Sequence, residues 1–245
     1  MEDKALLSTE VASGAEKAEL LIFIPAYNEA ENIERVVNHL TANFPQYDYV
    51  VVNDGSRDET AAICQRNGYN LLNLPVNLGL AGAFQAGLKY ADKYGYQYAV
   101  QLDGDGQHRP EYLESMIKKM EEGYDIVIGS RFVGEKKPFT MRMLGSNLIE
   151  MAIRFTTGVN IKDPTSGMRM FSKRMIREFA SGLNYGPEPD TVSYLIRQGA
   201  RVAEVPVIMD ERILGVSYLT PVNAMRYMLK MLISILLIQN FRKRR

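Results

Sequence analysis

Two aspartates one residue apart, Asp103 and Asp105, follow an apolar run in the segment VQLDGDGQHRPE (residues 100–111). Two neighbouring carboxylates repel each other unless a positive charge lies between them. Carboxylate and amide oxygens are ligands that Mg²⁺ and Mn²⁺ prefer, and these ions usually keep positions open for substrate phosphates. The pair therefore predicts a divalent cation that bridges a diphosphate. His108 could support such a site, but we interpret it as a polar surface residue.

The segment PAYNEAENI (residues 25–33) joins an apolar run to a helical pattern. Tyr27 and Glu29 lie where the run ends, and there they could face a nucleotide. The structural alternative is that Asn28 caps the following helix and Glu29 favours its amino terminus. The segment by itself leaves both interpretations open.

A second polar segment, NDGSRDET (residues 53–60), has a good structural explanation. Asp54-Gly55 is a turn pair, and Ser56 with Glu59 fits a capping box. A carboxylate at a strand end can also accept hydrogen bonds from a base or a ribose, so Asp54 is a candidate nucleotide contact. The sequence lacks the G-x-G-x-x-G and G-x-x-x-x-G-K-[ST] patterns, which argues against a dinucleotide-binding Rossmann protein and a P-loop NTPase.

Strand-like apolar runs alternate with helical patterns through the first half of the chain. Strands are expected over residues 19–25, 47–54, 70–74, 98–103 and 124–130, and helices over residues 30–44, 59–68, 79–95 and 110–123. This alternation predicts an α/β fold with a mainly parallel central sheet and helices on both faces. Ligand sites of such sheets lie at the carboxyl ends of the strands, which is where the polar segments occur.

Two arginines in the second half could bind an anion. Arg131 follows the fifth expected strand, and Arg212 precedes the glycine-containing loop of ERILGVS (residues 211–217). A guanidinium at the rim of a sheet can bind a phosphate through two hydrogen bonds. The plainer alternative for a single arginine is a solvated or salt-bridged residue.

Glu188 and Asp190 are acidic residues at the start of a helix expected over residues 189–199. Charge complementarity with the helix amino terminus explains them without a ligand. The other elements expected here are a helix over residues 137–158, a loop entering a strand over residues 163–171, and a strand over residues 201–209.

The last 25 residues (221–245) form a very apolar helical pattern that ends in FRKRR. Arg226, Lys230 and Ser234 recur every fourth residue and predict one narrow polar stripe. The apolar positions around it are Met225, Leu229, Leu232, Ile233, Leu236 and Ile238. The pattern suits a helix in a membrane interface with its basic end toward anionic headgroups. A terminal helix packed on the domain, or in a dimer interface, explains it equally well.

Composition excludes several classes of protein. Hydrophobic residues make up 46% and charged residues 24% of the 245 residues, as in ordinary globular proteins, and the formal net charge of zero does not indicate nucleic-acid binding. The single cysteine, Cys64, rules out an internal disulfide framework. We expect residues 1–18 to be a flexible tail rather than a signal peptide, and no conventional transmembrane helix.

In their order, these motifs resemble the family 2 glycosyltransferases of GT-A fold, and most of all the polyprenyl- and dolichyl-phosphate sugar transferases. The resemblance extends from about Leu20 to Tyr218. It rests on PAYNEAENI, NDGSRDET, NLGLAGAFQAGLKYA, LDGDGQHRPE, GSRF, DPTSGMRMF, PEPD, AEVPV and ERILGVS. Each segment is modest alone, and their common order carries the resemblance.

The resemblance implies roles for individual residues. The nucleotide-sugar pocket would be lined by Pro25, Tyr27, Glu29, Val52, Asp54, Gln101, Asp103, Gly104 and Arg212. The Mg²⁺ or Mn²⁺ ligands would be Asp103, Asp105 and Gln107. Arg131 and Arg142 would receive the acceptor phosphate, and the catalytic set would be Asp105, Arg131, Arg212 and Asp190. One departure is Tyr218, because a lysine often occupies this place after the loop serine in the family.

The implied reaction is transfer of a hexosyl group, with inversion, from a nucleoside diphosphate sugar to a polyprenyl phosphate such as undecaprenyl phosphate, for cell-envelope glycan synthesis. A UDP-hexose is the favoured donor and GDP-mannose the other. A phosphate monoester is largely ionised at neutral pH, so the acceptor needs positioning more than deprotonation. Asp190 or Glu188 would then orient a substrate, whereas a neutral hydroxyl acceptor would need a base, for which Asp190 is the candidate.

The expected organisation is a GT-A domain over residues 19–218, followed by the basic amphipathic helix over residues 219–245. We expect a cytoplasmic protein, peripheral on the cytoplasmic face of the membrane and held there by this helix or by an anchoring partner. A homo-oligomer is the other expected association. Alternatives are a glycosyltransferase acting on a saccharide hydroxyl, a sugar-1-phosphate nucleotidyltransferase, and a catalytically silent subunit that binds nucleotide sugar.

Overall fold

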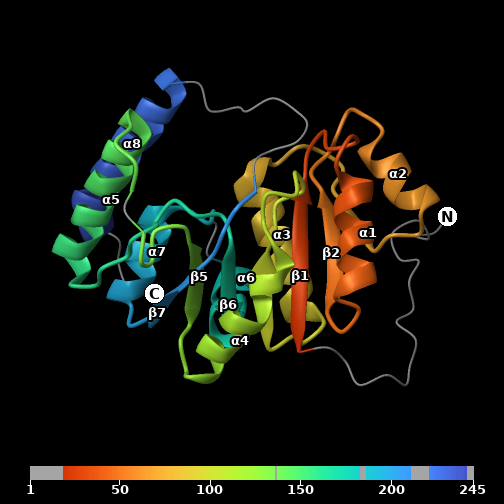
Figure 1. Cartoon of the computed structure of the whole chain (residues 1–245), viewed down its shortest axis with the longest axis horizontal. Coiled ribbons are helices and arrows are strands. Elements are labelled where there is room, and N and C mark those ends of the chain that lie inside the picture. Colours follow the sequence, from red (N-terminus) through yellow and green to blue (C-terminus); the bar gives the residue numbers. More distant parts are fainter. Residues whose placement is uncertain (1–18, 136, 183–185, 211–220, 242–245) are drawn as a thin grey trace.

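The computed structural model describes residues 19–135, 137–182, 186–210 and 221–241 of the chain. In these residues seven strands form one sheet in the order β3-β2-β1-β4-β6-β5-β7 (Figure 1). The strands are β1 (Leu20–Ala26), β2 (Asp48–Asn53), β3 (Leu71–Asn73), β4 (Tyr98–Gln101), β5 (Ile126–Ser130), β6 (Arg169–Ser172) and β7 (Val202–Pro206). All neighbours are parallel except β6, which runs antiparallel to β4 and β5, so the predicted mainly parallel α/β sheet is confirmed.

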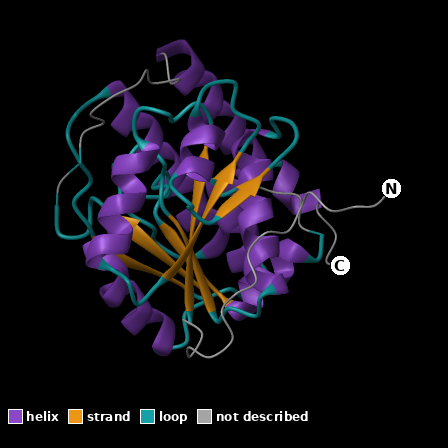
Figure 2. Cartoon of the chain, turned by 90° about the vertical axis from the view of Figure 1, so that its right-hand side faces the viewer, coloured by secondary structure: helices purple, strands orange, loops and turns teal. Residues whose placement is uncertain are grey.

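Helices flank both faces of this twisted sheet (Figure 2). They are α1 (Ile33–Asn43), α2 (Thr60–Arg66), α3 (Gly79–Lys93), α4 (Leu113–Glu121), α5 (Met141–Thr157), α6 (Lys173–Ala180), α7 (Pro189–Arg197) and α8 (Pro221–Leu236), with short 3-10 turns η1 (Pro110–Tyr112) and η2 (Ile238–Phe241). Helix α6 was not among the elements expected from the sequence. It has eight residues and follows β6 directly, so its helical periodicity covers barely two turns.

The sheet buries an apolar layer on each face because side chains alternate along every strand. In β1, Leu21 and Phe23 belong to one layer, while Leu20, Ile22 and Ile24 belong to the other.

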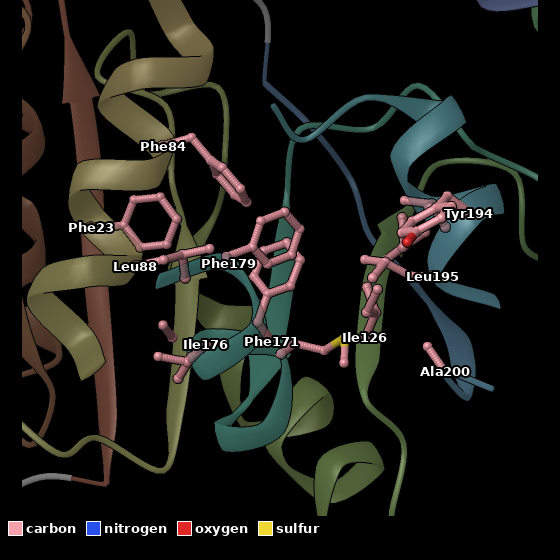
Figure 3. Packing of buried hydrophobic residues seen from close by; sticks show 14 of the residues in the cluster. Phe23, Phe84, Leu88, Ile126, Phe171, Ile176, Phe179, Tyr194, Leu195 and Ala200 are labelled. Atoms are coloured by element: carbon pink, nitrogen blue, oxygen red, sulfur yellow. The ribbon is translucent and has the colours of Figure 1, made fainter. Parts of the chain in front are cut away.

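The layer that contains Phe23 also holds Phe84 of α3, Phe171 of β6 and Phe179 of α6 (Figure 3). Their rings meet edge to face, with centroids 5.1–5.7 Å apart. Such pairs contribute about 0.5–1.5 kcal/mol each beyond the burial of their area. This packing fixes α3 and α6 against the strands whose ends carry the polar segments.

The strand directions bring the polar segments to one edge. The carboxyl ends of β1, β2, β4 and β5 lie together there, whereas the antiparallel strand β6 begins at that edge. Arg169, the first residue of β6, is therefore paired with both Gln101 of β4 and Ile128 of β5. A site at this edge receives residues from strand ends and from one strand start.

Helix α8 packs on the domain, beside α5 and against α7 (Figure 1). Met231 and Ile235 are buried in this contact. Gly145 of α5 allows the close approach, because a β-carbon there would lie 1.6 Å from the sulfur of Met228. The expectation of one polar stripe is wrong in part: Arg226 and Lys230 are exposed, but Ser234 is buried against the domain. Among the described residues, no helix combines the length and hydropathy needed to cross a membrane.

Candidate active site

The loops after β1 and β2 are joined by hydrogen bonds across the sheet edge. The backbone N–H of Asn28 donates to Ser56 Oγ at 3.0 Å, and Arg57 N–H donates back to Asn28 Oδ1 at 2.9 Å. Glu29 N–H donates to Thr60 Oγ1 at 2.9 Å. Asn28 has a φ of 55°, the left-handed region in which asparagine is tolerated better than most residues. The polar side chains thus hold the two loops together.

This network replaces the local caps that the sequence patterns predict. Helix α1 has Asn32 at its amino-terminal cap and helix α2 has Glu59, and neither cap residue makes a capping side-chain hydrogen bond. Asn28 does not cap α1, and the capping box expected for Ser56 and Glu59 is wrong. Ser56 instead accepts its hydrogen bond from Asn28, 28 positions earlier in the chain.

Asp54 is buried beneath the next loop. Its N–H donates to Ala26 O at 2.9 Å, and its Oδ1 accepts from Leu78 N–H at 2.7 Å. Gly55 has a φ of 61°, and a β-carbon there would lie 2.6 Å from Asn77 N. Asp54 therefore ties the end of β2 to the loop that opens α3, which accounts for one carboxylate oxygen. Its nucleotide contact stays a prediction.

The loop of Asp103 and Asp105 packs directly on the loop after β1. A β-carbon on Gly104 would lie 3.1 Å from Pro25 O and 3.5 Å from Glu29 Cγ. Glycine at this position lets the two backbones approach, so the structure brings three of the predicted nucleotide-site residues together. Two other members differ in exposure, since Tyr27 is half-buried whereas the side chain of Val52 lies fully in the core.

Asp103 is held from two sides. Its Oδ1 accepts from Gln101 Nε2 at 2.8 Å, and its backbone N–H donates to His108 Nδ1 at 3.0 Å. His108 Nε2 lies 3.6 Å from Asp103 Oδ2. The interpretation of His108 as a surface residue is wrong, because it is 7% exposed and supports the aspartate loop.

Asp105 is also nearly enclosed, with 8% exposure. Its Oδ1 accepts from Gln107 N–H at 3.0 Å, and its carbonyl oxygen accepts from Arg35 at 3.1 Å. The side-chain nitrogen Nε2 of Gln107 donates to Asp210 O at 3.1 Å. The side-chain oxygen Oε1 is therefore the Gln107 atom that could be a metal ligand. The loop therefore holds its shape through contacts with α1 and with the segment after β7.

The chemistry of this loop fits a divalent cation. The described residues contain no group of three or more His, Cys, Asp or Glu that could enclose a metal by themselves. Two carboxylates, Asp103 and Asp105, leave coordination positions for substrate oxygens, as Mg²⁺ and Mn²⁺ sites usually do. In addition, the buried Oε1 of Gln101 has no hydrogen-bond partner among the described residues.

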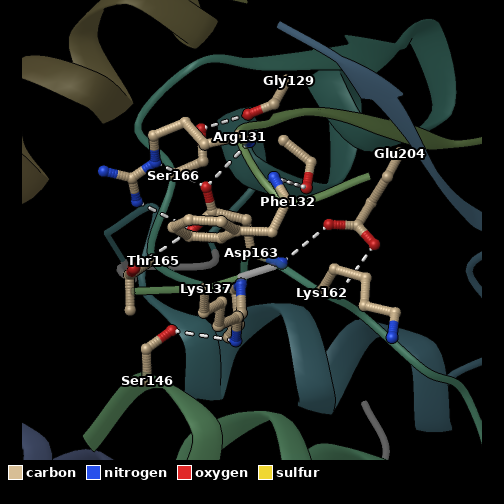
Figure 4. Close-up of polar contacts among 12 residues, drawn as sticks. Gly129, Arg131, Phe132, Lys137, Ser146, Lys162, Asp163, Thr165, Ser166 and Glu204 are labelled. Atoms are coloured by element: carbon tan, nitrogen blue, oxygen red, sulfur yellow. Dashed lines mark hydrogen bonds and ion pairs between the residues drawn. The ribbon is translucent and has the colours of Figure 1, made fainter. Parts of the chain in front are cut away.

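Arg131 lies at the same edge, held by Asp163 (Figure 4). Its Nε donates to Asp163 Oδ2 at 2.7 Å and its Nη2 to Oδ1 at 2.8 Å. The Asp163 side chain is 0% exposed and that of Arg131 is 24% exposed. Asp163 is held in turn by Thr165, and its N–H donates to Glu204 of β7 at 2.8 Å. This pair uses two of the five N–H donors of the guanidinium.

The side chains of the two other arginines predicted to bind phosphate lie outside the described part of the structure. Arg142 is the second residue of α5, and its side chain lies outside the described residues, as does all of Arg212. The chain that leads toward Arg212 is nevertheless anchored, because Asp210 N–H donates to Gln107 O at 3.0 Å. Arg109 donates to both carboxylate oxygens of Asp210, and these hydrogen bonds lower the pKa of Asp210.

Sequence reasoning missed Arg169, which is 1% exposed. Its guanidinium donates to three backbone carbonyls: Ser166 O at 2.9 Å, Pro164 O at 2.7 Å and Pro187 O. Burial lowers the pKa of this arginine. The residue joins the loop after α5 to the segment before α7. An arginine at a strand start, after the turn of DPTSGMR, was the one available signal.

The acidic residues before and in α7 contact the C-terminal helix. Tyr227 Oη donates to Glu188 Oε2, and Ser234 Oγ donates to Asp190 Oδ2 at 2.6 Å. Asp190 lies in the first turn of α7, as the charge-complementarity interpretation requires. Both carboxylates therefore have partners on α8, and a direct role in the reaction stays a prediction.

Solved structures share this fold. Glucosyl-3-phosphoglycerate synthase from Mycobacterium tuberculosis, solved with Mn²⁺, UDP and glucosyl-3-phosphoglycerate, has a TM-score of 0.61, is 20% identical, and the match covers 90% of this chain and 79% of that one. A mannosyltransferase from Pyrobaculum calidifontis, solved with GDP-mannose and Mn²⁺, has a TM-score of 0.57 and 17% identity over 83% and 59% of the two chains. The fold is the GT-A fold of such transferases.

Sequence comparison assigns the family. The model of glycosyl transferase family 2 matches residues 21–179, and the chain belongs to this family: it is a glycosyltransferase. Polyprenol monophosphomannose synthase from Mycolicibacterium smegmatis is 32% identical over 86% of this chain and 84% of its own length. Undecaprenyl-phosphate mannosyltransferase from Micrococcus luteus is 31% identical over 81% and 86%. A UDP-N-acetylglucosamine–dolichyl-phosphate N-acetylglucosaminyltransferase from Methanococcus voltae is 30% identical over 77% and 84%.

Proposed function

We propose that this glycosyltransferase moves a hexosyl group, with inversion, from a nucleoside diphosphate sugar to a polyprenyl phosphate. The observation that carries the proposal is that the Asp103–Asp105 loop and the Arg131–Asp163 pair lie at the same edge of the sheet. The loop suits the diphosphate of a donor, and the guanidinium suits the phosphate of an acceptor. The relatives named above act on polyprenyl or dolichyl phosphates, which supports this acceptor class.

Asp103, Asp105 and Gln107 Oε1 would hold a Mg²⁺ or Mn²⁺ ion. When bound, the cation would supply charge neutralisation for the departing nucleoside diphosphate. The protein's own part is to keep the two carboxylates in place, through Gln101 and His108 for Asp103 and through the Gln107 backbone for Asp105. Arg212 would close onto the diphosphate, a role supported by Asp210, two residues earlier, whose N–H donates to Gln107 O.

The donor nucleoside would lie over the joined loops after β1 and β2. The residues proposed for this part of the site are Pro25, Tyr27, Glu29, Val52, Asp54, Gln101, Asp103 and Gly104. The half-buried Tyr27 and Glu29 line its surface, whereas the side chains of Val52 and Asp54 are buried beneath that surface and support it. Both a UDP-hexose and GDP-mannose remain in the proposal, because the named relatives include enzymes for mannose and for UDP-N-acetylglucosamine.

Arg131 and Arg142 would position the acceptor phosphate. Asp163 fixes the orientation of the Arg131 guanidinium and leaves further N–H donors for a phosphate. A phosphate monoester is already largely ionised at neutral pH, so in-line attack needs no protein base. Ser234 donates a hydrogen bond to Asp190, which supports a role of Asp190 in positioning rather than as the base that accepts a proton.

The lipid acceptor requires a membrane surface, for which α5 and α8 are the proposed contact. Their exposed apolar residues form what we term the apolar ridge: Leu144, Leu148, Met151 and Phe155 of α5 with Met225, Leu229, Ile233 and Leu236 of α8, each between 39% and 86% exposed. The exposed charges beside them are basic: Arg154, Arg226 and Lys230. This arrangement suits a peripheral protein on an anionic, cytoplasmic membrane face.

Transfer of radiolabelled sugar from a panel of UDP- and GDP-sugars to undecaprenyl phosphate, with Mg²⁺ or Mn²⁺, tests the proposal. We expect label in the lipid fraction that depends on metal and is lost in Asp105→Ala. Asp92→Ala, an exposed aspartate of α3, is the matched control and should keep full activity. Donor hydrolysis without lipid product would contradict the proposed acceptor. No turnover of any donor would contradict the proposed transfer reaction.

A further inference from the structure

Helix α8 touches the domain through two hydroxyl groups set in an apolar contact. Tyr227, Met231 and Ser234 lie one helical turn apart in succession and face inward, and Ile235 is buried beside them. A buried hydroxyl costs free energy unless it is hydrogen-bonded. Both hydroxyls are satisfied by carboxylates of one short segment, residues 186–190, so the contact is specific and not merely apolar.

The two hydrogen bonds hold the middle and the last residue of that segment. Tyr227 donates to Glu188, the residue before α7, and Ser234 donates to Asp190, the second residue of α7, at 2.6 Å. Gln239 adds a longer contact to Asp190 at 3.4 Å. Burial raises the pKa of Tyr227, with the neighbouring carboxylate adding to the effect, so this phenol stays a donor.

The same segment is connected to the site. Arg169 donates to Pro187 O and to Ser166 O, and a β-carbon on the adjacent Gly167 would lie 3.2 Å from Asp103 Oδ2. On its other side, a β-carbon on Gly186 would lie 3.1 Å from Ala81 in the first turn of α3. A displacement of residues 186–190 would therefore disturb the packing of both the aspartate loop and the start of α3.

We propose that Tyr227 and Ser234 are positioning residues for the transfer reaction: they hold Glu188 and Asp190 on α8, so that the site is complete only while α8 is seated on the domain. The reason is geometric. Glu188 and Asp190 closely follow Pro187, whose carbonyl oxygen accepts from Arg169, so holding both carboxylates on α8 also holds the segment that Arg169 links to the aspartate loop. The inference rests on the proposed function, because the outer face of α8 belongs to the apolar ridge.

Because one helix presents the ridge outward and the hydroxyls inward, contact with a lipid surface would favour the seated position of α8. We therefore expect the activity of the wild-type chain toward a short-chain polyprenyl phosphate to rise several-fold when vesicles with anionic lipid are added. Tyr227→Phe and Ser234→Ala should weaken this response, since the outward face would no longer be linked to residues 186–190.

The test compares Tyr227→Phe, Ser234→Ala and the double variant with wild type in steady-state kinetics. We expect kcat to fall by about tenfold for each single variant, as for a lost hydrogen bond to a charged group, while the donor KM changes by less than about twofold. Ser234→Thr, which keeps the hydroxyl, should restore kcat.

Matched controls exist at the opposite edge of the sheet. Tyr96→Phe removes a phenol hydrogen bond to Asp48 at 2.8 Å, and Ser172→Ala removes a hydroxyl contact with Asp125 at 3.3 Å. Both should lower stability without a change in kcat. If they lower kcat as much as the α8 variants do, or if Tyr227→Phe and Ser234→Ala leave kcat unchanged, the positioning role is wrong.

A second measurement is independent of the acceptor. Amide hydrogen exchange of residues 186–192 should be faster in Tyr227→Phe and Ser234→Ala than in wild type and in both controls. If the wild type forms no glycolipid, the proposed function fails, yet this exchange still decides whether α8 holds the segment. Unchanged exchange in all variants would overturn the inference by itself.

Discussion

The guanidinium of Arg131 is held by both oxygens of the Asp163 carboxylate, at 2.7 and 2.8 Å, and no part of the Asp163 side chain reaches solvent. A planar arginine fork matched to a fixed carboxylate has one orientation available. The buried aspartate therefore fixes the orientation of the guanidinium, and with it the direction of the remaining N–H donors of the arginine.

Asp163→Asn should weaken acceptor binding more than donor binding. The amide keeps the shape of the side chain but removes the charge and one acceptor oxygen, so Arg131 loses its fixed orientation. We expect the acceptor KM to rise about tenfold and the free energy of unfolding to fall by about 1–3 kcal/mol. Asp125→Asn breaks a similar two-oxygen pair with Arg174, at 2.8 and 2.6 Å, at the far edge of the sheet. An equal rise in acceptor KM in both variants would contradict the assignment.

Arg169→Met should be strongly destabilising. The substitution keeps an unbranched side chain but leaves two buried carbonyl groups and one partly buried carbonyl group without this donor. Each buried unsatisfied group costs about 1–3 kcal/mol. Arg174→Met is the control, because Arg174 is half-exposed and its loss should cost less than about 1 kcal/mol. Urea unfolding of both variants measures the difference. A loss below 1 kcal/mol for Arg169→Met would mean that the two loops do not depend on this arginine.

Cys64 should resist thiol reagents until the protein unfolds. Burial in α2 raises the pKa of its thiol to about 11, so almost none of it is thiolate at pH 8. We expect modification to be slow in buffer and complete in denaturing urea. Rapid modification of the native protein, measured with a chromogenic disulfide at pH 8, would show that α2 opens readily.

Stability should fall as the solution becomes acidic, in part through Asp125. Burial by itself would raise the pKa of this carboxyl, but hydrogen bonds from Arg174 and from the Arg201 backbone outweigh it, so the pKa lies below its ordinary value of 3.8. A lowered folded-state pKa contributes stability that is present above the unfolded pKa and is lost as pH falls through the folded one. Urea unfolding between pH 6 and 3 should therefore show a smaller pH dependence for Asp125→Asn than for wild type.

Serine substitutions in the apolar ridge should weaken vesicle binding. Phe155→Ser and Leu229→Ser each remove a large exposed side chain, and burial of such a side chain contributes about 1.5–3 kcal/mol. We expect at least about a tenfold loss of co-sedimentation with anionic vesicles for each variant. Leu80→Ser, at a residue that is 52% exposed in the first turn of α3, should bind like wild type. A loss shared by all three variants would argue against a defined membrane face.

Local patterns in the sequence were sufficient for most of the framework, although they did not reveal α6. The alternation of apolar runs with helical patterns identified the parallel strands. The loop of Asp103 and Asp105 was expected after one of them, and it lies at the carboxyl end of β4. Such signals depend on residues within one or two turns of each other, so they carry over directly into strands, helices and the loops between them.

The partners of the polar side chains were decided by tertiary packing. Asn28 and Ser56 both fit local caps, yet they bond to each other across 28 positions because β1 and β2 are neighbours. His108 is buried because its loop folds back on Asp103. Ser234 belongs to a polar stripe by spacing, but it faces the domain because Asp190 accepts its hydrogen bond there.

The sequence by itself thus determined the α/β framework, the order of its polar strand ends and the family resemblance, since these follow from short-range periodicity and motif order. The tertiary structure decided which distant groups meet: Arg131 with Asp163, Arg169 with the carbonyl oxygen of Pro187, and Tyr227 with Glu188. These pairs lie 18 to 39 positions apart, and a hydrogen bond over such a separation is set by the packing of whole elements, which no local pattern records.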